Sequence, residues 1–209
     1  MSGGVQGSAD PVELLRIVRL ILGKTCWRVE FGYGDELDLD LGQRLLRTGG
    51  PLRDKSYGEY QLCILADDWV LSDPSGQQLA SGSTLATYEI NDDTSAETLT
   101  NYERERKEIL ARLSAIVDQM VASIEMDAPH LGLRVTFRNS LTLTVFCRRG
   151  PDPGDWPKAG DDDEPMACWE LYLPDGSLAD VSRERAVPDW PLIKVLPEER
   201  WSVTSWGGP

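Results

Sequence analysis

Acidic side chains form the clearest chemical pattern in this sequence. Glu36, Asp38 and Asp40 alternate with leucines over residues 36–41, as in a half-buried strand. We expect the leucines to face the core and the three carboxylates to face solvent. A second acidic group lies in a long loop and comprises Asp161, Asp162, Asp163 and Glu164. Ionised carboxylates make charge-assisted hydrogen bonds with Lys and Arg, so both groups are candidate binding sites for a basic partner.

The same carboxylates suggest a second chemistry, the binding of a hard cation through oxygen ligands. Asp35, Asp38 and Asp40 would form such a site if the turn brought Asp35 beside the strand. However, carboxylates along one strand splay in a line, and the run DDDE lacks the alternating ligands and central glycine of an EF-hand loop. We therefore predict no metal site, and keep a carboxylate-based cation-binding protein or enzyme as an alternative.

Other groups that commonly carry catalysis are scarce. His130 is the single histidine, and no CxxC pair occurs among the four cysteines, which we expect to be buried free thiols. The tripeptide GKT at residues 23–25 has Val18 where a phosphate-binding loop requires its first glycine, and no GxSxG segment is present. The sequence therefore favours a protein without catalytic residues or a cofactor.

The charge of the chain limits its partners. Lys and Arg number 21 against 35 Asp and Glu, a formal net charge of −14 at pH 7. Such a field repels nucleic acid and anionic lipid and allows a basic protein partner. The most apolar segment, residues 14–22, is interrupted by Arg16 and Arg19, and residues 1–10 do not resemble a signal peptide. We expect a cytoplasmic protein that binds neither nucleic acid nor membrane.

A repeated frame indicates how the chain is organised. WVLSDPSG at residues 69–76 and WELYLPDG at residues 169–176 share the spacing WxLxxPxG, typical of a strand that runs into a Pro-Gly turn. Upstream of each frame an Arg-Val-x-Phe strand, a short turn and an alternating strand predict a hairpin, at residues 28–41 and 134–145. The matching order predicts an internal duplication.

Two helices are expected, one before each hairpin. Asp10, Pro11 and Glu13 fit the start of a first helix over residues 11–22, and Gly23 fits its end. A second, longer helix is predicted over residues 101–124, because its apolar residues recur at helical spacing. These residues are Ile109, Leu113, Ile116, Val117, Met120 and Ile124.

The predicted fold class is α+β, with two tandem related units of helix and antiparallel strands, one short N-terminal helix and one long central helix. The predicted domains are a flexible N-terminus (residues 1–10), a first repeat (11–90), a linker (91–100), a second repeat (101–187) and a Trp- and Pro-rich C-terminal segment packing on the body (188–209).

The long loops of the two repeats differ in charge. Residues 42–58 are mainly basic, whereas residues 148–165 are acidic and contain Trp156. Loops of this length inside domains are commonly functional or disordered. Three interpretations stay open: the loops attract each other across the two repeats, they form a binding surface with Trp156 as an exposed anchor, or both are simply solvated.

Three functions follow from these patterns. The favoured one is a non-enzymatic acidic interaction module, such as an inhibitor or immunity-type protein that masks a basic surface of its partner. The alternatives are the carboxylate-based cation-binding protein or enzyme, and a structural subunit that self-associates into a homo-oligomer. Self-association would use the long helix or the C-terminal segment WSVTSWGGP.

Overall fold

A computed structural model of the whole chain describes residues 11–32, 35–46, 56–64, 69–88, 90–91, 93–127, 132–146, 167–174, 178–182 and 192–196. Its helices are α1 (Pro11–Val18), η1 (Arg19–Ile21), η3 (Gly82–Thr87), α2 (Ala96–Leu113) and η4 (Ser114–Ile116). Its strands are β1 (Thr25–Phe31), β2 (Leu37–Leu46), β3 (Ser56–Ile64), β4 (Trp69–Ser72), β5 (Gln78–Ser81), β6 (Gln119–Asp127), β7 (Gly132–Phe137), β8 (Thr142–Val145), β9 (Ala167–Tyr172), β10 (Leu178–Ser182) and β11 (Leu192–Leu196). The predicted α+β class is confirmed.

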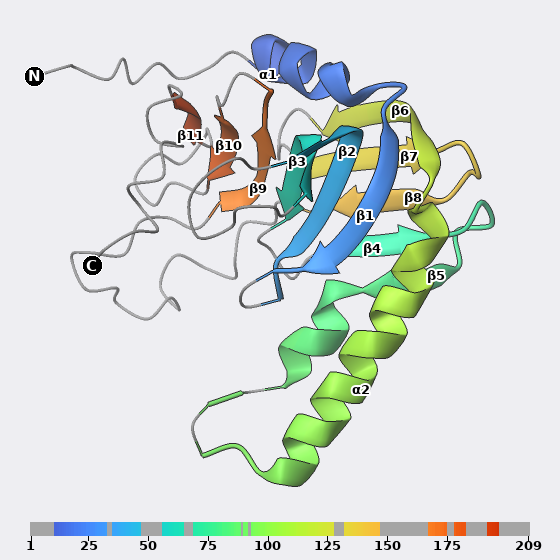
Figure 1. Cartoon of the computed structure of the whole chain (residues 1–209), viewed down its shortest axis with the longest axis vertical. Coiled ribbons are helices and arrows are strands. Elements are labelled where there is room, and N and C mark those ends of the chain that lie inside the picture. Colours follow the sequence, from blue (N-terminus) through green and yellow to red (C-terminus); the bar gives the residue numbers. More distant parts are fainter. Residues whose placement is uncertain are drawn as a thin grey trace, which may run out of the picture.

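Within the described residues the strands form one antiparallel sheet of 11 strands in the order β11-β10-β9-β3-β2-β1-β6-β7-β8-β4-β5. The sheet bends between β1 and β6, whose register covers two residue pairs, Thr25 with Met120 and Cys26 with Gln119. Figure 1 shows β1, β2 and β3 in front of β6, β7, β8 and β4, with the strands of the two parts crossing. Phe31 of β1 and Trp69 of β4 meet between these parts, with ring centres 6.4 Å apart.

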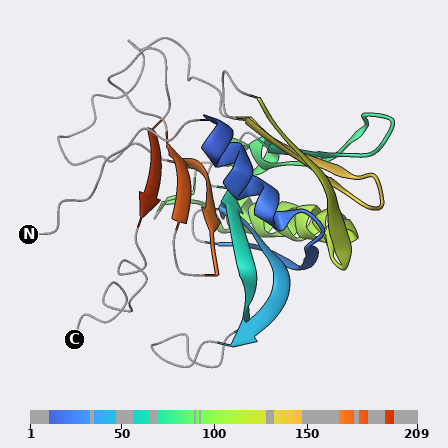
Figure 2. The same ribbon diagram turned by 90° about the horizontal axis from the view of Figure 1, so that it is seen from above.

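The core lies between the two parts of the bent sheet. Leu39, Leu62 and Leu171 are registered neighbours on β2, β3 and β9, and each is at most 1% exposed. Leu37 and Leu41 are buried on the same face of β2, as the alternation predicts. Helix α1 lies at one end of the two parts (Figure 1, Figure 2) and contributes further buried apolar side chains. The bent sheet therefore encloses one core to which both halves of the sequence contribute.

The predicted bounds of the long helix are wrong at both ends. Helix α2 begins at Ala96, within the stretch expected to be a linker, because the Ser95 side chain accepts a hydrogen bond from Thr98 N at 3.1 Å and caps it. It ends at Leu113, and η4 follows. Asp118 then adopts φ 63 and the chain continues as β6. Apolar residues after position 116 therefore serve a strand, which an apolar helical spacing alone does not distinguish.

The first helix is close to its predicted position. It divides into α1 and η1, and Gly23 follows with φ 74, the left-handed conformation expected of a glycine that ends a helix. Asp10 lies outside the described residues. Lys24, from the rejected GKT motif, bonds both oxygens of Glu59 on β3, at 3.0 and 2.9 Å. This basic side chain is therefore already paired within the fold.

Both predicted hairpins and both WxLxxPxG strands are confirmed. β1 pairs with β2, and β7 with β8. Trp69 and Trp169 are at most 1% exposed on β4 and β9. In the first frame, Asp73 Oδ1 accepts hydrogen bonds from Ser75 N and Gln77 N, while Gly76 takes φ 86. The shared frame thus builds a strand with an inward Trp, followed in the first copy by a tight turn.

Each strand that carries one of these frames pairs with a strand from the other half of the chain. β4, from the first half, pairs with β8 of the second half. β9, from the second half, pairs with β3 of the first. The strands β3 and β6 have no place in the predicted repeat, and the internal duplication is not confirmed. Pairing across the halves is nevertheless extensive, so each half supplies strands that extend the other half's hairpin.

Candidate functional site

The polar face of strands β1, β2, β3 and β9 brings acidic side chains from both halves together. Asp38 is registered with Glu30 on β1 and with Cys63 on β3, and Cys63 is registered with Glu170 on β9. Registered neighbours of antiparallel strands project to the same face. These side chains therefore form a row across four strands, on the face opposite to Leu39.

Asp40 lies one step along the same face, and its predicted exposure is wrong. It is 1% exposed, and its carboxylate accepts hydrogen bonds from Gly58 N at 2.6 Å, Gln61 Nε2 at 2.9 Å and Arg28 Nε. Gly58 approaches so closely that a Cβ on it would lie 2.6 Å from Leu41 N. Buried carboxylates need such donors, so Asp40 holds three strands together and is not open to a partner.

Asp38 has a less complete set of partners. Burial raises its pKa, and the charges of Glu30 and Asp40 add to that rise, whereas a hydrogen bond from the Cys63 thiol and the charge of Arg28 oppose it. Its Oδ1 atom is buried without a hydrogen-bond partner among the residues that the structure describes. A buried carboxylate oxygen without a donor disfavours the charged form of Asp38, in line with its raised pKa.

Glu36 converges on Asp38 beside Gly32. A Cβ on Gly32 would lie 3.0 Å from Asp38 Oδ2 and 3.3 Å from Glu36 Oε2, so the absence of a side chain there leaves room for both carboxylates. Burial raises the pKa of Glu36, and the charges of Asp38 and Glu170 raise it further. The carboxylate face, defined here as Glu30, Glu36, Asp38 and Glu170, therefore concentrates negative charge.

Glu30 and Glu170 are the members of this face that the sequence patterns missed, and Glu170 comes from the other half of the chain. A hydrogen bond holds Glu170 in place. Its Oε2 accepts a hydrogen bond from Tyr172 Oη at 2.5 Å. Burial raises the pKa of Tyr172 well above its usual range, and the charge of Glu170 adds to the rise, so the phenol stays protonated as a donor. The alternation of Trp169, Glu170 and Leu171 marks Glu170 as outward-facing, but pairing of β9 with β3 places it beside Cys63.

Basic side chains border the carboxylate face at one end. Two guanidinium groups contact the ring of Trp27, with Arg28 Cζ 5.1 Å and Arg44 Cζ 5.2 Å from its centre. Arg28 also lies 3.4 Å from Glu30. This cation-π arrangement holds two basic side chains beside the acidic row, and Arg28 is also paired with Asp40.

The other predicted acidic residues do not join this cluster. Asp35 accepts hydrogen bonds from Tyr102 and Arg106 of α2 through Oδ1, so it is engaged elsewhere. The set Asp35, Asp38 and Asp40 proposed for a cation is therefore divided among separate interactions. The remaining predicted partner-binding residues lie outside the described residues: Trp156, Asp161, Asp162, Asp163 and Glu164.

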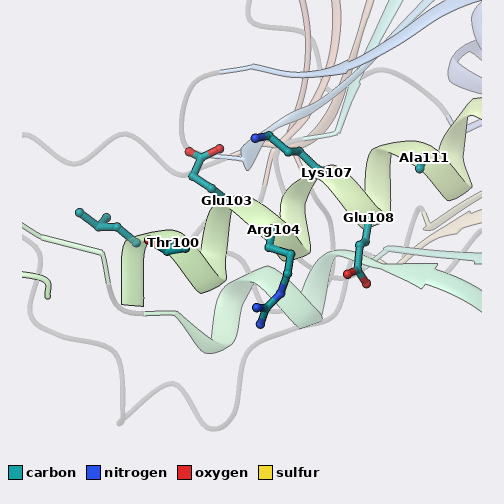
Figure 3. Close-up of a pocket in the computed structure, with 7 residues that line it drawn as sticks. Thr100, Glu103, Arg104, Lys107, Glu108 and Ala111 are labelled. Atoms are coloured by element: carbon teal, nitrogen blue, oxygen red, sulfur yellow. The ribbon is translucent and has the colours of Figure 1, made fainter. Parts of the chain in front are cut away.

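Two surface depressions lie along α2, away from the carboxylate face. The first, of about 630 Å³, is drawn in Figure 3 and is lined by Leu99, Thr100, Glu103, Arg104, Lys107, Glu108 and Ala111. The second, of about 510 Å³, is lined by Gln77, Gln78, Leu79, Ala111, Arg112 and Ala115. Neither depression contains a member of the carboxylate face.

These features define an α+β protein with a bent antiparallel sheet and an acidic patch on one polar face. Comparison with protein-family models, with curated proteins and with solved structures finds no match for this chain. Among the described residues, no three His, Cys, Asp or Glu side chains are grouped so that they would hold a metal ion. No helix in the described part of the chain is long and apolar enough to cross a membrane.

Proposed function

We propose that this chain is a non-enzymatic interaction module that binds a basic segment of another protein on its carboxylate face. The observation that carries the proposal is the state of Asp38 and Glu36. Their pKa values are raised by burial and by neighbouring acids, and Asp38 Oδ1 lacks a hydrogen-bond donor among the described residues. A Lys or Arg side chain of a partner, placed against this row of carboxylates, would supply the opposite charge.

The charge of the whole chain supports the same partner. With a formal net charge of −14, the protein attracts a basic surface over a distance and speeds its association. Arg44, stacked on Trp27 at the border of the face, would meet an acidic group of the partner and so fix its orientation. An inhibitor or immunity-type protein that masks a basic surface fits this charge distribution.

The geometry favours a basic side chain over a metal ion as the bound cation. The carboxylates come from separate strands in a row, and no set of three among the described residues closes around one point. Metal ions such as Ca²⁺ require six or more oxygen ligands around a centre, whereas a guanidinium or ammonium group bonds two carboxylates in a line.

Capture from a lysate of the source cell tests the proposal. We expect the immobilised wild-type protein to retain a basic protein at low salt and to release it at high salt, because salt screens the attraction. The triple variant Glu36→Gln, Asp38→Asn, Glu170→Gln should fail to retain that protein, which is then purified and titrated against each variant.

A matched variant separates the carboxylate face from net charge. Asp93→Asn, Glu97→Gln and Glu125→Gln also remove three negative charges, but from exposed positions elsewhere. We expect this control to bind with nearly wild-type affinity. Equal loss in both triple variants would show that overall charge alone attracts the partner, and unchanged binding in both would rule out the carboxylate face.

A further inference from the structure

The outward face of α2 forms one continuous strip. Figure 1 shows the helix projecting beyond the sheet, so its N-terminal half extends away from the strands. The two depressions along it share Ala111, and together they run from Leu99 to Ala115 and the edge of β5. Figure 3 shows the side chains of the first depression spread along the helix.

The strip has room for another element to approach closely. Thr100 and Ala111 of α2 and Ala115 of η4 are small and exposed. Leu99 is 40% exposed at the projecting end, whereas Leu79 of β5 lines the second depression at the other end. Small residues on a helix face allow a second helix to pack at short distance.

Three charged side chains of the strip have no ionic partner among the described residues, and two others pair with each other. Glu103, Arg104 and Lys107 make no ion pair within the described part of the chain, and Arg112 lies 3.8 Å from Glu108. The strip therefore offers both signs of charge at defined positions along one helix, in a protein that is otherwise strongly acidic.

We propose that a second copy of this chain packs against the strip, with the two α2 helices antiparallel around a two-fold axis that passes between Lys107 and Glu108. In that register Lys107 faces Glu108 of the second copy, and Glu103 faces its Arg112. A two-fold axis makes every such contact twice, so four opposite-charge pairs form. Only a limited set of registers places opposite charges face to face. In this register, each of these four charged residues faces a residue of opposite charge in the second copy.

The same register matches the shape of the strip. Thr100 lies opposite Ala115 of the second copy, so small residues face each other toward both ends of the contact. The projecting half of each helix then extends along the body of the other chain. Leu99 enters the second depression beside Leu79 of the second copy, which removes the exposed leucine from water.

Charge-swap variants distinguish this dimer from pairing within a single helix. In Lys107→Glu, and separately in Glu108→Lys, like charges face each other across the axis, so we expect dimer affinity to fall about tenfold or more. In the double variant K107E/E108K, opposite charges face each other again, and affinity should return. If these charges acted only within one helix, the double variant would not recover. K107E places a negative charge four residues after Glu103, and E108K places a positive charge four residues after Arg104, so the two unfavourable effects would add.

Sedimentation velocity over a wide range of concentrations measures the dimer, and circular dichroism confirms that each variant is folded. Wild type should shift from one chain to two as concentration rises. Ala111→Arg should hold the protein as a monomer, while Arg138→Glu, an exposed charge reversal in the β7–β8 turn, should leave the dimer unchanged. A wild-type monomer at every concentration, or a double variant as weak as both single variants, would overturn the proposal.

Discussion

Arg106 of α2 reaches the β1–β2 turn, where its Nε donates a hydrogen bond to Asp35 Oδ1 over 3.1 Å. The guanidinium also donates to the carbonyl oxygen of Phe31 at 3.3 Å and lies 5.2 Å from the Phe31 ring centre. Tyr102, one helical turn earlier, donates to the same Asp35 oxygen at 2.5 Å. Burial and this hydrogen bond to Asp35 raise the pKa of Tyr102 to about 12. Two side chains of α2 therefore fasten the helix to one carboxylate of the sheet.

Arg106→Ala should lower the free energy of unfolding by about 2 kcal/mol, because a charged hydrogen-bond network is lost and Asp35 keeps one partner fewer. Urea unfolding measures the change. Arg138→Ala, which removes an exposed arginine of the β7–β8 turn, should change stability by less than about 0.5 kcal/mol. Asp35→Asn keeps the preference for the φ of 66 at this position, so a double-mutant cycle with Arg106→Ala isolates the pair. Strictly additive effects would show that the pair is not coupled.

Asp38→Asn should raise the melting temperature at pH 7. Because the folded-state pKa of Asp38 is raised, its protonated form favours folding. This contribution is present below the unfolded pKa, about 4 for a free carboxyl, and is lost as pH rises through the folded pKa. The neutral Asn side chain avoids that loss, so its advantage should shrink as pH falls toward about 4.

Asp73→Asn should change the melting temperature in the opposite direction. Hydrogen bonds from Ser75 and Gln77 lower the pKa of Asp73, so its charged form favours folding. That stability is present above the unfolded pKa and is lost as pH falls through the folded one. The variant should therefore melt below wild type at pH 7 and approach it in acid. Thermal melts of both variants across this pH range would contradict the argument if the two shifts had the same sign.

Gly58→Ala should destabilise the protein severely, by about 3 kcal/mol or more, because the added Cβ would lie within 2.6 Å of backbone atoms of Leu41 and Tyr60. Gly76→Ala provides the control. A Cβ there meets no atom within 4 Å, and only its φ of 86 is unfavourable, which costs about 1–2 kcal/mol. Chemical unfolding ranks the two, and a smaller loss for Gly58→Ala would mean that β2 and β3 separate easily at this point.

Residues 1–90 and 91–209, produced as separate chains, should each fail to form a stable monomeric fold. β4 requires β8, and β9 requires β3, so each fragment lacks a neighbour for one buried Trp strand. Produced together, the fragments should associate and recover the circular dichroism of the intact protein. Cooperative unfolding of either fragment alone as a monomer would instead support two independent domains.

Local patterns in the sequence predicted the parts of the fold that depend on neighbours in the chain. The alternation around Leu39 identified β2 and its inward face, and the Trp69 and Trp169 frames identified two strands. These features follow from a side-chain period of two and from Pro-Gly turn chemistry.

Contacts distant in the sequence account for the errors. Asp40 has the pattern of an outward residue, but Gly58 and Gln61 of β3 donate to it and exclude water. Glu170 joins Cys63 only because β9 pairs with a strand of the other half. The apolar spacing beyond Ile116 fits either a helix or a strand, and the segment forms a strand because it pairs with β7.

The pairing of β9 with β3 also sets an order of events during synthesis. Ile64 of β3 pairs with Trp169, which is synthesised roughly 100 residues later. At a translation rate of about 5–20 residues per second, Trp169 follows about 5–20 s after Ile64. Throughout that interval β3 presents an unpaired edge and an apolar face to other chains, the condition under which nascent proteins aggregate. Slower translation would lengthen this exposure, so the yield of folded protein should depend on chaperone supply until β9 emerges.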